Sequence, residues 1–388
     1  MAYRKKFLSV TICLSNQSLP KLKRLKSKSL LHWGRQAMIK QVKNGQQLQI
    51  VTPLAAERIA GDGLLTTYKK VVDISQQGKQ QIIHYGLSQN DYNEVQRKLK
   101  TQRDFLRYSY LYDTLQEKKL PLESIVISAY HNPDRYYAEI QNRVNTLVEE
   151  ATRRGLVPIF MTLTLPGEYH RMKQTKFRKM IANPCYNGTS PAEAVKVLTK
   201  LFAKLRQDRS LKELSKEERI YYRVNEPHKD GTPHTHILMY IPADRVDRVI
   251  RAFNRLFDPS ANDIQTDIND ASAYVMKYIN KTLPLSKKEK LSESERYLNA
   301  WYSKHRIIRF NSSRTLAPLK IYRLLYRRFS LRALTKLCRN KELSIFVPVD
   351  DENKIMEIFD GDELLYMRNE NFRINRIGRA EREYLRAA

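Results

Sequence analysis

A hairpin signal in the middle of the chain is the feature that most constrains its fold. Two segments rich in β-branched and aromatic residues, residues 219–226 (RIYYRVNE) and 234–241 (HTHILMYI), flank the pair Asp230-Gly231. Strand-like segments joined around an Asp-Gly pair typically form an antiparallel hairpin. Because alternate side chains of a strand share a face, His234 and His236 project the same way. The sequence therefore predicts an antiparallel sheet with two imidazoles at one end of a hairpin.

The segments around the hairpin predict further strands and covering helices. Asn132-Pro133 predicts the start of a helix that ends at Gly155, and Ser190-Pro191 opens another with a capping box. The other expected elements are strands over 159–165 and 263–268 and helices over 243–257 and from Asp270 to about Leu283. The order β-α-β-β-α-β-α predicts an α+β fold, with a mainly antiparallel sheet flanked by helices. The polar segment 284–296 is expected to be a linker or loop.

The paired histidines predict a metal site. Across the hairpin, Glu226 can lie near the face that carries His234 and His236. Two imidazoles and one carboxylate suit a divalent ion that keeps open positions for water and substrate. The alternative is a pair of ordinary strand-end histidines with local hydrogen bonds, because an H-x-H pattern alone is a weak signal.

The helix expected after Asp270 contains a second unusual pattern, YVMKYINK at 274–281. One arc of this helix carries two phenols and two ammonium groups, namely Tyr274, Lys277, Tyr278 and Lys281. Apolar residues on the opposite side (Val275, Met276 and Ile279) can pack on the sheet. A tyrosine can act as a covalent nucleophile, and nearby lysines can lower its pKa and hold a phosphate. A plain amphipathic helix would give a similar split without requiring two tyrosines.

The charge of the chain predicts a polyanionic partner. The net charge is +29, and nucleic acid is the usual partner of so basic a protein. Residues 1–50 contain eleven Lys and Arg and no acid, and residues 297–341 contain twelve and no acid. The cations expected to contact DNA are Lys304, Arg306, Arg309, Arg323, Arg327 and Arg328.

Aromatic residues are interleaved with the second cationic stretch. They are Tyr297, Trp301, Tyr302, Phe310, Tyr322, Tyr326 and Phe329. These rings could stack on unpaired bases. Alternatively, leucines of the same segment (Leu324, Leu325, Leu331 and Leu334) bury the rings and the charges only face water. Both interpretations remain open at this point.

The cysteines indicate a reducing compartment, and the hydropathy of the chain bears on signal peptides and membrane spans. The cysteines Cys13, Cys185 and Cys338 stand singly, which excludes a zinc ribbon and gives no sign of a disulfide framework. The N-terminal MAYRKKFLSVTICLS has only a short apolar run without a cleavage motif, so a buried strand is expected there. No stretch approaches the ~20 apolar residues of a membrane span.

Three segments together resemble a known superfamily. FMTLTLPGEYH, EPHKDGTPHTH and YVMKYINK, in this order, resemble the three motifs of HUH-superfamily rolling-circle replication initiators, above all those of the phage replication gene A protein family. The resemblance covers roughly residues 130–285. It implies a central sheet of the RRM or palm type, a Mg²⁺ or Mn²⁺ ion on His234, His236 and Glu226, and alternating nucleophiles Tyr274 and Tyr278, each with a lysine three residues later (Lys277 and Lys281).

Some residues of these segments depart from the motifs or have no implied chemical role. Thr235 stands where the superfamily usually has a hydrophobic residue. His228 matches no ligand and is expected to be a solvated loop residue. Thr162 and Thr164 belong to the first motif and are expected to pack or contact DNA beside the site.

The resemblance implies a replication initiator that nicks one strand at a phage or mobile-element origin. It would form a 5′-phosphotyrosine link and later rejoin the strand. The implied partners are single-stranded and origin duplex DNA and the host helicase, single-strand-binding protein and DNA polymerase, in the cytoplasm of a bacterial host and without a membrane. Because the chain lacks a G-x-x-x-x-G-K-[ST] phosphate loop, the helicase is expected to come from the host.

Other functions remain open to different degrees. Relaxases usually place the tyrosine before the histidines, which argues against that variant, whereas a two-tyrosine transposase shares the present order. A non-catalytic DNA-binding repressor would be expected to have lost a ligand or a nucleophile, and none is missing. A two-histidine phosphoesterase would need a second H-x-[ST]-like repeat, which the sequence lacks.

We expect four regions along the chain. Residues 1–125 form a basic N-terminal region, interpreted as an accessory DNA-binding domain, and residues 126–285 form the endonuclease core. Residues 286–340 form a basic, aromatic-rich helical DNA-binding segment. Residues 341–388 form a C-terminal tail or small subdomain.

Overall fold

The computed structural model describes residues 8–11, 82–176, 180–268, 271–283 and 291–378. Of the predicted N-terminal accessory region 1–125, the structure describes residues 8–11 and 82–125, so the basic stretch before residue 50 lies outside the described residues apart from Leu8–Thr11. Within the described part of the chain, no helix combines the length and the apolar character that crossing a membrane requires.

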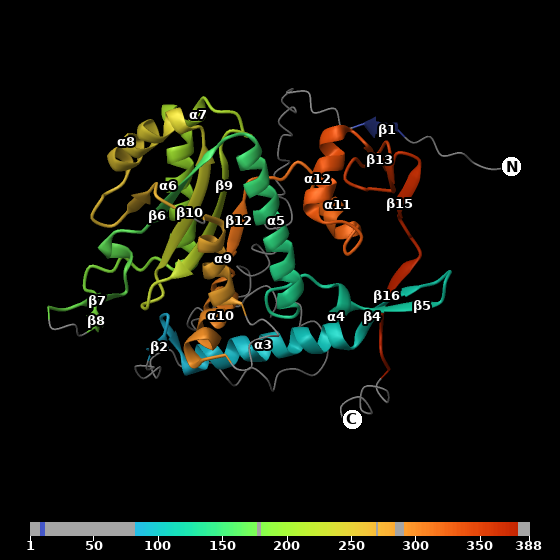
Figure 1. Cartoon of the computed structure of the whole chain (residues 1–388). Helices are drawn as coiled ribbons and strands as arrows, with labels where there is room; N and C mark the ends of the chain where they lie inside the picture. Colours follow the sequence, from blue (N-terminus) through green and yellow to red (C-terminus); the bar gives the residue numbers. More distant parts are fainter. Residues whose placement is uncertain (1–7, 12–81, 177–179, 269–270, 284–290, 379–388) are drawn as a thin grey trace, which may run out of the picture. The chain divides into compact units, whose positions relative to one another are not determined.

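Five described strands form an antiparallel sheet in the order β11-β6-β10-β9-β12 (Figure 1). Their bounds are β6 Val157–Leu163, β9 Ile220–Pro227, β10 Pro233–Ile241, β11 Asp263–Gln265 and β12 Phe310–Ser312. The predicted hairpin is confirmed, since β9 and β10 pair with Pro227 opposite Pro233. Strand β11 includes only the first half of the predicted segment 263–268.

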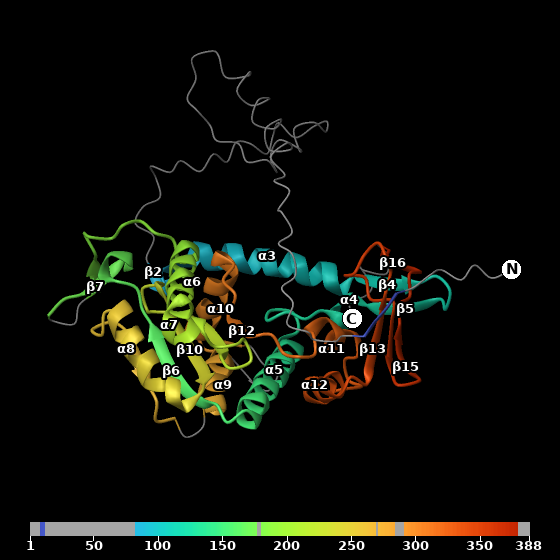
Figure 2. The same cartoon turned by 90° about the horizontal axis from the view of Figure 1, so that it is seen from above.

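Helices cover both faces of this sheet (Figures 1 and 2). Alternation along the strands decides which residues meet which helices. Phe160 and Leu238 pack with α5 (Pro133–Arg153) and α9 (Ala271–Thr282). Met161 and Ile237 pack with α6 (Pro191–Gln207) and α8 (Val246–Leu256), which follows the short helix η4 (Ala243–Arg245). The coarse prediction of a mixed fold with an antiparallel sheet between helices is confirmed.

The two predicted helix starts are also confirmed. The side chain of Asn132 accepts a hydrogen bond from the backbone N–H of Arg135, with Pro133 at the first helical position. Ser190 and Glu193 form the capping box of α6. These caps satisfy N–H groups that have no partner within the helix.

The predicted linker over 284–296 is wrong at its C-terminal end. Helix α10 (Glu293–His305) begins there, because Ser292 and Glu295 form a capping box that starts the helix. The helix packs against α3 (Gln89–Arg107) through a buried cluster that includes Trp301 and Leu99. Residues 284–290 of the predicted linker lie outside the described residues.

Two further sheets join segments from opposite ends of the chain. A four-stranded sheet, β1-β13-β14-β15, packs on α11 and α12, and a three-stranded sheet has the order β16-β4-β5. Strand β1 confirms a strand within the N-terminal apolar run. The bounds are β1 Leu8–Thr11, β4 Ser109–Asp113, β5 Lys118–Pro121, α11 Leu319–Leu324, α12 Leu331–Asn340, β13 Leu343–Val347, β14 Glu357–Asp360, β15 Glu363–Met367 and β16 Phe372–Arg376.

Short elements complete the described chain. They are β2 Ile82–His84, β3 Leu87–Ser88, α4 Leu122–Ile125, η3 Gly167–Tyr169, β7 Met172–Gln174, β8 Met180–Ala182 and α7 Arg209–Lys212. Because β1 pairs with β13 and β4 pairs with β16, N-terminal and C-terminal segments share sheets. The division of the chain into four regions stays a prediction.

Candidate metal and nucleophile site

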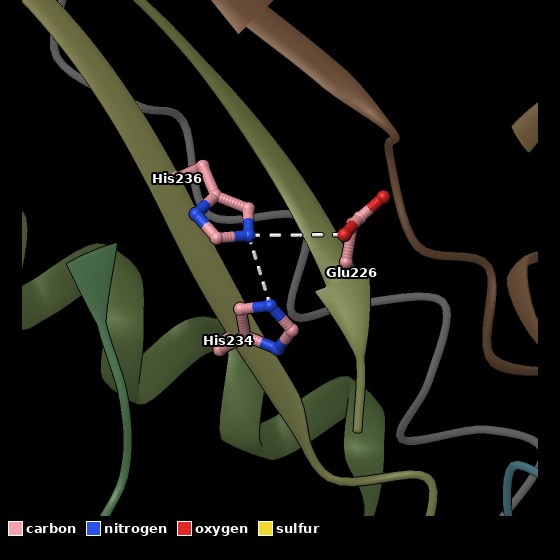
Figure 3. Close-up of side chains that lie close together, drawn as sticks. All are labelled: Glu226, His234 and His236. Atoms are coloured by element: carbon pink, nitrogen blue, oxygen red, sulfur yellow. Dashed lines mark hydrogen bonds and ion pairs between the residues drawn. The ribbon is translucent and has the colours of Figure 1, made fainter. Parts of the chain in front are cut away.

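The hairpin brings the three predicted ligands together at the end of β9 and β10. Glu226 is the direct cross-strand partner of His234, and His236 follows two residues later on the same face (Figure 3). One potential ligand atom from each of Glu226, His234 and His236 lies within 4.8 Å of the others. Glu226 and His236 are buried, and His234 is half-buried. The structure thus places the predicted triad at one point.

The distances within the triad fit a shared cation. The Nε2 atoms of His234 and His236 are 3.0 Å apart, and Nε2 of His236 lies 3.7 Å from a carboxylate oxygen of Glu226. Two ligands held at right angles, each about 2.1 Å from one ion, lie about 3 Å apart. The second carboxylate oxygen of Glu226 is buried without a hydrogen-bond partner among the described residues. A buried carboxylate oxygen without a partner is costly, and a cation would remove that cost.

Thr162 holds the ring of His236 from the neighbouring strand. Thr162 of β6 is the cross-strand partner of His236, and its hydroxyl lies 3.2 Å from Nδ1 of that ring. If Nδ1–H donates to the hydroxyl, Nε2 keeps a lone pair for a ligand. Thr164 instead receives a hydrogen bond at its backbone, where its N–H donates to the side chain of Asn262. The first motif therefore supports the triad through Thr162, a contact that the sequence analysis did not assign.

His228 is not the solvated loop residue that the sequence predicted. Its ring packs between His234, with centroids 4.2 Å apart, and His170, with centroids 5.1 Å apart. Burial lowers the pKa of His228, and the neighbouring His170 lowers it further, so the ring is uncharged at neutral pH. The hydrogen bond between His170 and Asp230 raises the pKa of His170. These contacts place His228 and His170 beside the triad.

The turn of the hairpin is clamped by α10 and by the segment before β3. Trp301 donates a hydrogen bond to the carbonyl of Gly231, and the hydroxyl of Tyr302 donates to the carbonyl of Asn225. Gly231 has a φ of +92°, and a Cβ there would collide with the backbone carbonyl of Tyr85. Only glycine accommodates both the conformation and the close approach. The turn next to the triad is therefore fixed by contacts from α10 and from the backbone of Tyr85.

Helix α9 brings Tyr278 to the triad. The ring of Tyr278 stacks on His236 with centroids 4.2 Å apart and planes 25° apart, and it also lies parallel to Phe160. The sequence predicted that Tyr278 faces away from the sheet, which is wrong: its ring packs at the margin of the buried face. Ile279 is buried and Met276 partly buried in the same core, as predicted.

The other predicted residues of α9 are described to different extents. Lys277 is exposed, one residue before Tyr278. Tyr274 lies one turn earlier in the helix and Lys281 lies in its last turn. The side chains of Tyr274 and Lys281 lie outside the described part of the structure.

Most of the cations predicted to contact DNA have partners within the protein. Arg309 is only 4% exposed and donates a hydrogen bond to Asn299. Arg323 makes two 2.7 Å hydrogen bonds to the buried carboxylate of Glu139. Lys304 pairs with Asp91, and Arg328 pairs with Glu363 and donates to the carbonyl of Leu365. Arg306 and Arg327 are exposed.

The aromatic residues interleaved with these cations are mostly in the core. The buried ones are Tyr297, Trp301, Tyr302, Phe310 and Tyr322. Tyr326 and Phe329 pack partly buried against Tyr322, Leu325, Leu331 and Leu334. For the five buried rings, the structure supports burial and contradicts stacking on bases.

Comparison with known proteins identifies a family for this chain. The sequence profile of the bacteriophage replication gene A protein (GPA) family matches residues 75–285, more than half of the chain. The chain is 29% identical over 271 residues to the replication gene A protein of Escherichia phage 186, covering 63% of this chain and 38% of that protein. It is 29% identical over 213 residues to the replication protein of Haemophilus phage HP1 (strain HP1c1), covering 51% and 26%.

A third relative carries an enzymatic description. The probable replication endonuclease from prophage-like region 1 of Salmonella typhi is 27% identical over 248 residues, covering 56% of this chain and 30% of that protein. The matches thus span well under half the length of these relatives, and no solved structure matches the chain. Since the family profile matches more than half of the chain, over a range that includes β9, β10 and α9, the chain belongs to the bacteriophage replication gene A protein family.

Proposed function

We propose that this chain is a metal-dependent, site-specific single-strand DNA endonuclease and strand transferase of the HUH type. It initiates rolling-circle replication at the origin of a phage or related mobile element, in the cytoplasm of a bacterial host. The observation that carries this proposal is the stacking of Tyr278 on His236, beside Glu226 and His234. In this proposal, the nucleophile and the cation site share one face of the sheet. The relative described as a probable replication endonuclease supports the same activity.

The residues on this face can carry out a transesterification. A divalent ion, Mg²⁺ or Mn²⁺, held by Glu226, His234 and His236, would polarise the scissile phosphate and stabilise developing negative charge. The phenol oxygen of Tyr278 or Tyr274 attacks phosphorus and loses its proton. The bond from phosphorus to the 3′ oxygen breaks, that oxygen takes up a proton, and the 5′ phosphate stays on the tyrosine.

Two features of this reaction fit the site, namely the negative charge of the phosphate and the exchange of one phosphodiester for another. Lys277 and Lys281 both belong to α9, and in this proposal their ammonium groups would hold the phosphate. Because one phosphodiester replaces another, the strand can be rejoined without ATP. The free 3′-hydroxyl primes synthesis by a host polymerase, with a host helicase and single-strand-binding protein. The names of the relatives favour a replication initiator over a two-tyrosine transposase or a relaxase, whose chemistry would be the same.

A covalent capture experiment tests the proposal. A random single-stranded DNA library with a fluorescent label at the 3′ end is incubated with the protein and Mn²⁺, and the products are separated in SDS. We expect a labelled protein band, because the 3′ fragment stays on the tyrosine. The same library labelled at the 5′ end should give shortened free DNA that a polymerase can extend. If neither product forms with Mn²⁺, or both form equally in EDTA, the proposed activity is wrong.

The hydroxyl of Thr162 gives a second test through metal affinity. Thr162→Val keeps the shape of the side chain but removes the hydrogen bond to Nδ1 of His236. We expect Mn²⁺ binding, measured by calorimetry, to weaken by about 10- to 100-fold, as for other partners of metal-ligating histidines. Thr162→Ser should restore the affinity. Equal Mn²⁺ affinity of the valine variant and the parent would exclude this role for Thr162.

A further inference from the structure

The three-stranded sheet β16-β4-β5 carries two tyrosines and two cations on one face. Tyr110 and Tyr112 lie two residues apart on β4 and share that face. The strand register places Arg373 of β16 and Lys119 of β5 on either side of Tyr112. Asn375 and Pro121 flank Tyr110 in the same way, so no described strand position on this face is acidic. We call the six residues Tyr110, Tyr112, Lys119, Pro121, Arg373 and Asn375 the tyrosine face.

Helix α3 contacts the opposite face of this sheet through one described ring contact. Arg376 pairs with Ser109, which alternates with Tyr110 and so points away from the tyrosine face. The guanidinium of Arg376 lies 4.9 Å from the ring centroid of Phe105, near the end of α3. Helix α4 packs on α3, and both helices contact β4 (Figure 2). The contact between Arg376 and α3 therefore lies on the face opposite the tyrosines.

The acid nearest to the tyrosines points to the other side. Asp113 lies next to Tyr112 along β4, so it projects from the opposite face. Its carboxylate is buried and accepts hydrogen bonds from the side chain of Asn369 and from the backbone of Leu115 and Gln116. No strand position on the tyrosine face therefore places a carboxylate beside its cations.

The side chains of the tyrosine face are accessible. Lys119 and Arg373 are exposed, and Tyr110 and Tyr112 are half-buried. The ring centroids of the two tyrosines are 6.5 Å apart, and Nζ of Lys119 lies 5.1 Å from the centroid of Tyr110. Neither Lys119 nor Arg373 has an ion pair with any described carboxylate. Both cations are thus free to meet an anionic ligand within the described structure.

We propose that the tyrosine face is a second binding site for single-stranded DNA, separate from the nicking site. Aromatic side chains that are flanked by cations bind single strands by stacking on unpaired bases while the cations meet the phosphates. A duplex offers the phosphates but keeps its base faces stacked, so the two rings select unpaired DNA. This inference goes beyond the proposed nicking activity, because it assigns a place where the displaced or template strand is held.

Binding of a fluorescent oligothymidylate, followed by anisotropy in EDTA, tests this inference. The variant Tyr110→Ala/Tyr112→Ala should bind at least about tenfold more weakly, since each stacked base contributes measurably. Tyr110→Phe/Tyr112→Phe keeps both rings and should bind like the parent. Binding of a duplex hairpin of equal charge should change by less than about twofold in either variant.

The cations are tested through the salt dependence of binding. Lys119→Gln/Arg373→Gln should reduce the slope of log affinity against log salt by about 1.4, or about 0.7 for each phosphate that is no longer neutralised. Lys118→Gln/Arg376→Gln removes the same charge from the opposite face and serves as the matched control. Its slope should stay close to that of the parent.

Photocross-linking distinguishes the removal of a DNA-binding side chain from misfolding of a variant. An oligonucleotide containing 5-iodouracil should cross-link the parent protein at Tyr110 or Tyr112, located by mass spectrometry. Unchanged affinity of the double alanine variant, or cross-links at neither tyrosine, would overturn the inference. If an acidic peptide binds at the tyrosine face and oligothymidylate does not, the inference is overturned in favour of a protein partner. Because these measurements use EDTA and no cleavage, they fail or succeed independently of the proposed nicking activity.

Discussion

The variant His234→Ala/His236→Ala is expected to lose covalent adduct formation while it still binds DNA. Both rings direct Nε2 to the point that Glu226 also faces, so the variant lacks two of the three proposed ligands. Several kcal/mol of stabilisation of the charged transition state are lost with the ion, which corresponds to at least about a 10³-fold slower reaction. DNA binding should change little, because most of the cations of this protein lie elsewhere in the sequence.

Two companion variants separate ligand loss from structural damage. The ring of His236 packs against Phe160 and Tyr278, so an alanine leaves a cavity, whereas His236→Phe keeps a ring without a ligand atom. We expect His236→Phe to be as inactive as the double alanine variant and more stable in thermal unfolding. His131→Ala, at a histidine whose ring bonds Gln102 away from the triad, is the control and should react like the parent. Full adduct formation by the double alanine variant in EDTA would end the metal proposal.

Strand alternation explains why the triad could be predicted from sequence. A two-residue spacing fixes His234 and His236 on one face, and a short hairpin fixes which residue of β9 meets them. Thr162 could not be found in this way, because its pairing with His236 joins strands 74 residues apart. Composition and spacing do not give the register of such distant strands. The same limit hid His170, whose partner Asp230 is 60 residues away.

Local composition could not decide between the two interpretations of the basic, aromatic-rich segment. A pattern of rings and cations fits both a DNA-binding surface and a buried helix. The structure shows burial because α10 packs on α3, where the hydroxyl of Tyr297 donates to Gln89, 208 residues earlier. Arg309 likewise lies against the ring of Tyr302 in the interior. Only the distant partner reveals which side of each residue is covered.

The helical wheel for 274–281 grouped residues by their angle around the helix, but it did not show which of them the sheet covers. It grouped Tyr278 with Lys277, and Lys277 is indeed exposed. A helical wheel does not show how far the sheet extends beyond the apolar side of the helix. Here His236 of the sheet stacks on the ring of Tyr278. A residue at the margin of an amphipathic helix can thus be polar in pattern and packed in the fold.

The two tyrosines are expected to share the cleavage reaction. After initiation, one tyrosine would hold the 5′ end of the displaced strand, and the regenerated origin must be cut again while that link persists. Tyr274 and Tyr278 are one helical turn apart, about 6 Å of rise, so a modest movement of α9 can bring either phenol to the same phosphate. The new 3′-hydroxyl then attacks the first link, and a closed circle is released.

Phenylalanine variants distinguish this alternation from a single nucleophile. Because the ring of Tyr278 stacks on His236, Tyr278→Phe removes the nucleophile and keeps the packing. Tyr274→Phe and Tyr278→Phe should each still form the adduct within about tenfold of the parent rate, and the double variant at least about 10³-fold more slowly. Each single variant should release few circles in a replication assay, because it lacks the second nucleophile. If one single variant is as inactive in cleavage as the double and the other behaves like the parent, only one phenol is catalytic and the other packs beside it.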